Sequence, residues 1–80
     1  MKSEDILQQI HALDQRIEQQ PHDDQLFLER GSLYWKLQDW KHTLEDYEVA
    51  IRLNPSSPAV ELRQMAQQVI AFYHKDRYNP

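Results

Sequence analysis

The sequence contains no cysteine, a single glycine and no long hydrophobic run. Without cysteine, the chain can form neither disulfides nor thiolate metal or redox sites. No apolar segment approaches the roughly 18 residues needed to cross a bilayer, and acidic residues interrupt the N-terminal stretch where a secretory signal needs an apolar core. We therefore expect a cytoplasmic protein that does not enter a membrane, unless the chain is excised from something larger.

The net charge is negative, and the charged residues are distributed along the whole chain. Thirteen Asp and Glu against nine Lys and Arg give a net charge of -4, and no basic stripe follows any predicted helix, which argues against nucleic acid as a partner. The length of 80 residues suits one small domain. Ordering them at roughly 1.5 kcal/mol each costs on the order of 120 kcal/mol, so the chain needs an efficient apolar interior or a partner.

Helix signals recur along the chain, whereas alternating strand patterns and hairpin turns are missing. The pattern predicts an all-α protein of four antiparallel helices, over residues 3–20, 24–38, 39–54 and 58–75. Short connections make consecutive helices antiparallel neighbours. We expect N-caps at Ser3, at Asp23 or Asp24, at Asp39 and at Ser57 before Pro58. Residues 76–80 are expected to fray or to dock loosely.

One sequence pattern occurs twice in the chain. Ile10, Leu13, Ile17 and Pro21 recur 34 positions later as Leu44, Tyr47, Ile51 and Pro55. A helix, a turn and a second helix at this period are typical of the tetratricopeptide repeat. The opening of that motif, an aromatic residue, Leu-Gly and Tyr, is matched by Phe27, Arg30, Gly31 and Tyr34; its second helix is matched by Thr43, Tyr47, Ala50 and Pro55.

The chain therefore resembles the tetratricopeptide repeat family. The resemblance implies a short solenoid of helical hairpins in residues 1–80, with a complete repeat at 24–57, a preceding half-repeat helix at 3–20 and a capping helix at 58–75. Departures from the motif occur in both flanks. The first helix has Gln9 and Arg16 where small residues are preferred, and the last has Glu61, Gln64, Met65 and Gln68 at the motif positions.

Two helices should approach closely at Gly31, because glycine has no side chain to hold them apart. The last helix carries a broad apolar arc and is expected to act as a lid on the solenoid. Met65 and Phe72 lie at the edge of this arc, where they would be exposed and available for self-association.

Catalytic and metal-binding patterns are not evident. The four histidines, His11, His22, His42 and His74, form no pair at helical spacing and are interpreted as surface residues. Glu45, Asp46 and Glu48 lie opposite the apolar stripe and are interpreted as a solvated face. We expect no enzyme activity, no cofactor and no metal.

In the family, the first helix of each pair lines a groove that holds peptides. The corresponding positions here are Gln25, Leu28, Ser32, Trp35 and Lys36. Trp35 and Leu28 stand beside the packing stripe, so they either contact a partner or pack under the last helix. Lysine and asparagine positions that would grip a terminal carboxylate are not matched, and an aromatic-lined groove favours apolar peptide side chains or a helix.

The resemblance thus implies a non-enzymatic protein-protein interaction module that binds a peptide or helix of an unidentified partner. The alternative is a structural homo-oligomer in which a second copy completes the missing half-repeat and covers the last helix, because about three repeats are usually needed for a stable solenoid.

Overall fold

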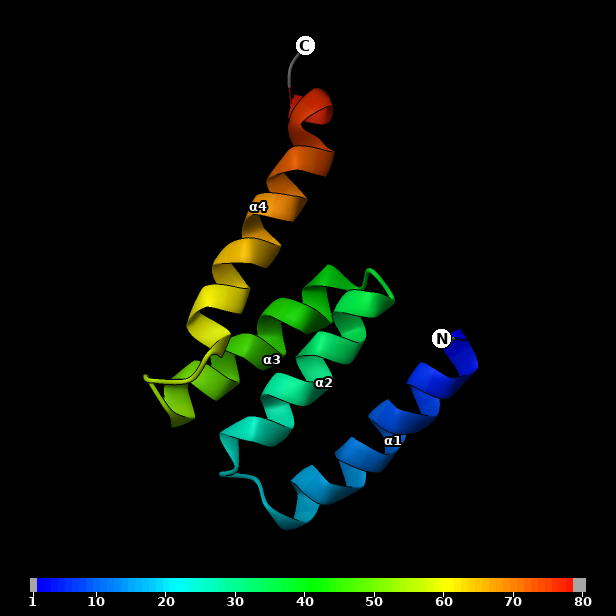
Figure 1. Cartoon of the computed structure of the whole chain (residues 1–80), viewed down its shortest axis with the longest axis vertical. Helices are drawn as coiled ribbons and strands as arrows, with labels where there is room; N and C mark the ends of the chain where they lie inside the picture. The colour runs from blue at the N-terminus through cyan, green and yellow to red at the C-terminus, as the bar shows by residue number, and fades with distance from the viewer. Residues whose placement is uncertain (1, 79–80) are drawn as a thin grey trace.

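The structure, a computed structural model, describes residues 2–78, with side chains to Tyr73. Four α-helices and no strands make up this part of the chain: α1 spans Ser3–Gln19, α2 Asp24–Lys36, α3 Trp40–Leu53 and α4 Ala59–Tyr78. Consecutive helices run in opposite directions and are joined by short turns (Figure 1). The extents of 47 × 31 × 16 Å describe a flat molecule, little thicker than a single helix with its side chains. The expected all-α class is confirmed.

Three of the four expected N-caps are present. Asp23 accepts a hydrogen bond from the Gln25 amide at 3.0 Å, Asp39 from the His42 amide at 3.3 Å, and Ser57 from the Ala59 amide at 3.1 Å. The expectation for Ser3 is wrong, because α1 already begins at Ser3 and no side chain caps it. The acidic residues of its first turn stabilise this end of α1 by interacting with the positive end of the helix dipole.

The turns that follow α1 and α3 have the same hydrogen-bonding pattern. Three backbone hydrogen bonds recur at an offset of 34 residues: Gln20 N to Arg16 O with Asn54 N to Ala50 O, Asp23 N to Gln20 O with Ser57 N to Asn54 O, and Leu26 N to Asp23 O with Val60 N to Ser57 O. The capping bonds of Asp23 and Ser57 keep this offset. The repetition in the sequence is therefore also a repetition of structure, with α3 equivalent to α1 and α4 equivalent to α2.

Two apolar clusters hold the helices together. The first joins α1 to α2 and consists of Ile6, Ile10, Leu13, Leu26 and Leu33. The second joins α2 and α3 to the start of α4 and consists of Phe27, Tyr47, Ala50 and Ala59. The predicted close approach at Gly31 is confirmed, because a Cβ atom there would lie 2.9 and 3.0 Å from two ring carbons of Tyr47.

The connection between α2 and α3 is tight. Gln38 adopts φ 58°, a left-handed conformation that glycine usually provides after a helix. The next residue, Asp39, donates its amide hydrogen to the carbonyl of Tyr34 at 3.0 Å and so closes the turn. The sequence contains no glycine at this place.

Only the first half of α4 packs as the expected lid. Ala59 and Ala66 are fully buried, whereas Met65 is 53% exposed and Phe72 is 75% exposed. Figure 1 shows the second half of α4 projecting beyond the other helices. The helix continues to Tyr78, so the expected end near Lys75 and the frayed segment 76–78 are wrong; Asn79 and Pro80 lie outside the described residues.

Candidate functional site

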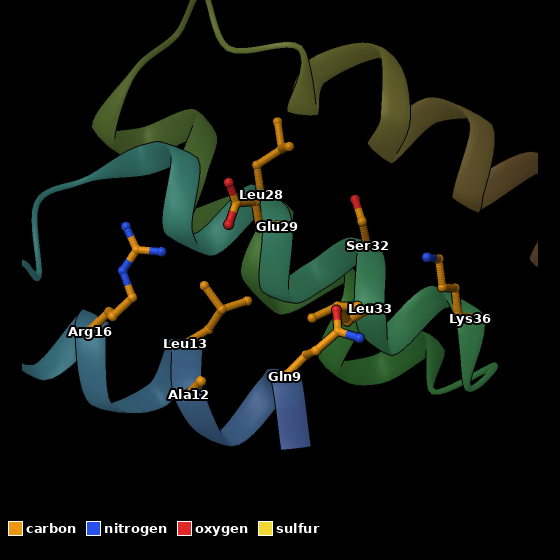
Figure 2. A pocket seen from close by; sticks show the side chains of 9 residues that line it. All are labelled: Gln9, Ala12, Leu13, Arg16, Leu28, Glu29, Ser32, Leu33 and Lys36. Carbon is orange, nitrogen blue, oxygen red and sulfur yellow. The ribbon is translucent and has the colours of Figure 1, made fainter. Parts of the chain in front are cut away.

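A groove of about 500 Å³ lies between α1 and α2. Figure 2 shows the side chains that line it, which come from both helices. From α1 these are Gln9, Ala12, Leu13 and Arg16; from α2 they are Leu28, Glu29, Ser32, Leu33 and Lys36.

The groove has an apolar centre and a positive charge at each end, and one acidic residue, Glu29, also lines it. Arg16 stands in the last turn of α1, and Lys36 stands in the last turn of α2. Because the two helices are antiparallel, these cations lie at opposite ends of the groove (Figure 2). The stretch of α2 from Leu28 to Lys36 covers about 12 Å at 1.5 Å per residue. Neither cation forms an ion pair with a described side chain.

A half-buried arginine fixes the helices that form the groove. Arg30 of α2 donates two hydrogen bonds to Asp46 of α3, at 2.8 and 2.9 Å, and a third to Asp14 of α1 at 2.7 Å. Its guanidinium also lies 5.5 Å from the centre of the Phe27 ring. The hydrogen bonding that Arg30 donates to Asp46 raises the pKa of Arg30 further above its ordinary value, against the opposing effect of burial. Arg30 therefore remains charged and joins three helices.

The interpretation of Asp46 as part of a solvated face is wrong. Asp46 is only 5% exposed, because the guanidinium of Arg30 covers both carboxylate oxygens. Its neighbours Glu45 and Glu48 are exposed as expected. A pattern of polar residues on one helix does not reveal a cation supplied by another helix.

Three of the five expected groove residues line this groove. Leu28, Ser32 and Lys36 follow one another at intervals of four residues along α2. Ser32 also forms a 2.8 Å hydrogen bond with the hydroxyl of Tyr47, which connects the groove to α3. Gln25 lies apart, in a smaller hollow near Asn54 and the start of α4.

Trp35 is not among the residues that line the groove. Its ring meets the edge of Trp40 at a centroid distance of 5.4 Å and lies 6.4 Å from the Tyr47 ring. It packs on the second apolar cluster together with Leu28 and Leu62 of α4. Of the two alternatives left open for Trp35, these contacts correspond to packing inside the molecule, where the side chain is partly buried.

The α1 side of the groove was not among the predicted groove residues. The signal was present in the repeat itself. Helix α3 buries Thr43, Asp46, Tyr47 and Ala50, and the α2 residues Phe27, Arg30 and Gly31 pack or hydrogen-bond there. Thirty-four positions earlier stand Gln9, Ala12, Leu13 and Arg16, the four α1 residues of the groove. The groove therefore occupies the place that a helix equivalent to α2 would take beside α1.

A second, shallower hollow lies on α4. It is lined by Met65, Gln68, Val69, Phe72 and Tyr73 and includes both residues expected to self-associate. The rings of Phe72 and Tyr73 contact each other edge to face, with centroids 5.8 Å apart. No other helix covers these two side chains, which are the most exposed aromatic residues described.

The described residues offer neither a metal site nor a membrane-spanning helix. No group of three or more His, Asp or Glu side chains there is arranged to hold a metal ion. His42 is paired with Asp39 at 2.7 Å and stacks on Tyr34, while His74 lies outside the described side chains. No described helix is long and apolar enough to cross a membrane.

Comparison of the chain with family models, curated proteins and solved structures found no significant match. The internal repeat and the two uncovered surfaces are therefore the features that bear on function.

Proposed function

We propose that the chain is a cytoplasmic, non-enzymatic protein-interaction module of the tetratricopeptide type. Residues 24–57 form its complete repeat, and the groove between α1 and α2 binds an amphipathic helix of a partner protein. The observation that carries this proposal is that the α1 side of the groove occupies the same positions in the repeat as the α3 face on which α2 packs. A surface that receives a helix in one repeat is uncovered in the preceding half-repeat.

The charges of the groove define the chemistry of the bound helix. Its apolar side chains would cover Ala12, Leu13 and Leu28, which lie between the two cations. If the bound helix runs in the direction of α2, its first turn lies near Arg16 and its last carbonyl groups lie near Lys36. An acidic residue in the first turn would then pair with Arg16, and Lys36 would interact favourably with the negative end of the helix dipole.

Selection from a peptide library tests this proposal. A library of randomised helical peptides would be selected on the wild-type chain, with counter-selection on Ala12→Arg. Ala12 is exposed and lines the groove, so arginine should fill the groove while keeping a high helix propensity. Selected peptides should carry an acidic residue one or two turns before an apolar stripe and should lose binding to Ala12→Arg.

A matched control is Gln67→Arg, which adds the same side chain to an exposed position of α4 that lines none of the hollows described here. It should bind the selected peptides as the wild type does. Arg16→Gln and Lys36→Gln should each weaken binding about two- to fivefold, the range expected of exposed charge pairs. Peptides that bind the wild type and Ala12→Arg equally would show that the groove is not the binding site.

A further inference from the structure

The geometry points to a particular occupant of the groove, namely α4 of a second copy of this chain. We propose that copies associate head to tail, with α4 of one copy lying in the groove between α1 and α2 of the next. This inference rests on the proposed function of the groove as a seat for a helix. It deepens that function by naming the partner.

Helix α4 has the right place in the repeat to be this occupant. It is equivalent to α2, since Ser57 caps it as Asp23 caps α2 and since the preceding turns share their hydrogen bonds. The groove is the seat of a helix equivalent to α2. Placing α4 of one copy in the groove of the next would therefore continue the helix order α1 to α4 across the boundary between copies.

Side-chain sizes at the two contacts are complementary. Inside the chain, Gly31 faces the large Tyr47 ring and the Cβ atom of Asp46. At the equivalent contact between copies, Met65 would replace Gly31, and it would face Leu13 and Ala12 of the next copy. A larger residue on α4 thus meets smaller residues on α1, which keeps the volume of the contact similar. Met65 is 53% exposed in the single chain and is free to make this contact.

The charges at the two contacts are complementary as well. Phe27 and Ala50 belong to one apolar cluster inside the chain. Their equivalents between copies are Glu61 of α4 and Arg16 of the next copy. Both residues are exposed, and neither forms an ion pair with a described side chain. Glu61 also stands in the first turn of α4, where the groove chemistry calls for an acid.

Such a contact joins two different surfaces, so an open assembly of any length leaves one groove uncovered at one end and one α4 uncovered at the other. A heterologous contact of this kind adds copies without an internal limit unless the ring closes. The average mass in solution should therefore rise with concentration. A two-fold dimer made through α4 alone would leave the groove empty and would stop at two copies.

Two variants that each block one surface provide the test. Ala12→Arg blocks the groove and leaves α4 intact, whereas Met65→Lys blocks α4 and leaves the groove intact. Sedimentation velocity should give a single chain for each variant alone, a mass that rises with concentration for the wild type, and a dimer for the equimolar mixture. Unchanged helical circular dichroism would show that both variants fold.

A charge exchange tests the register of the contact. Glu61→Arg and Arg16→Glu should each self-associate severalfold more weakly than the wild type, because each places like charges together. Their equimolar mixture should regain association, since every contact between the two kinds of copy pairs opposite charges. Equal weakness of the mixture and of the separate variants would overturn the proposed register.

Three results would overturn the head-to-tail arrangement: a wild type that stays a single chain, an equimolar mixture of Ala12→Arg and Met65→Lys that stays monomeric, or an Ala12→Arg variant that still dimerises. In each case, library peptides that bind the wild type and not Ala12→Arg would leave the proposed function standing. If both the association experiment and the peptide selection failed, the groove would not be a binding site for a helix.

Discussion

Replacing Gly31 by alanine should destabilise the fold although alanine is the better helix former. In a helix interior the change gains about 0.8 to 1 kcal/mol of propensity. The added Cβ would lie 2.9 Å from a carbon of the Tyr47 ring and 3.1 Å from the Cβ of Asp46. Tyr47 is fully buried and its hydroxyl is hydrogen-bonded to Ser32, so the ring has little room to withdraw.

The added atom must therefore push α2 and α3 apart. Overpacking of this kind costs about 1 to 3 kcal/mol, which leaves a net loss of about 1 kcal/mol for Gly31→Ala and a larger loss for Gly31→Leu. Urea unfolding followed by circular dichroism would measure both. The decisive comparison repeats Gly31→Ala in a Tyr47→Leu background, where the two ring contacts are removed and only the contact with the Cβ of Asp46 remains. There Gly31→Ala should no longer be destabilising, and it should stabilise by up to about 0.8 kcal/mol. Stabilisation by Gly31→Ala in both backgrounds would refute the close contact.

Three further predictions concern stability. Asp46→Ala should cost about 3 kcal/mol or more in urea unfolding, because it leaves the half-buried charge of Arg30 without its main partner. Gln38→Gly should raise the unfolding free energy by about 1 kcal/mol, since glycine adopts φ 58° without strain. Burial raises the pKa of Tyr47 and of Tyr34 above about 10, so the unfolded state loses these protons first and stability should fall as pH rises above about 10. Tyr47→Phe should be less stable near neutral pH, where the hydroxyl's hydrogen bond is lost, but should show a smaller alkaline loss in thermal melts.

The helices and most of their ends were predictable, because local chemistry determines them. Asp23, Asp39 and Ser57 accept amide hydrogen bonds in the first turns that follow them, as their positions before apolar periodic segments indicated. The close approach at Gly31 was also predictable, since the chain's only glycine stands in the middle of a helix that otherwise has good helix formers. The caps depend on residues near one another in the sequence, and the close approach was indicated by a single residue that lacks a side chain.

Contacts between distant residues were not predictable from helical periodicity. Asp46 and Glu45 are both acidic and adjacent, yet only Asp46 is buried, because Arg30 on another helix reaches it. Trp35 was placed beside the packing stripe, yet its ring contacts the ring of Trp40 across the turn between α2 and α3. The direction of each side chain depends on the angle between helices, which periodicity does not contain.

The composition of the two uncovered surfaces indicates that the proposed association would be reversible. On α1, Gln9 and Arg16 flank Ala12 and Leu13, and on α4 the exposed Met65 stands among glutamines. Polar residues at the rim lower the cost of leaving each surface in water, so the single chain does not need a partner to stay folded. Small apolar residues at the positions of Gln9 and Arg16 would give a more apolar and more permanent contact. We therefore expect dilution to separate the copies without unfolding them: the mass should fall towards that of one chain while the helical signal stays constant. A helical signal that fell together with the mass would show instead that the two uncovered surfaces are parts of an obligate core.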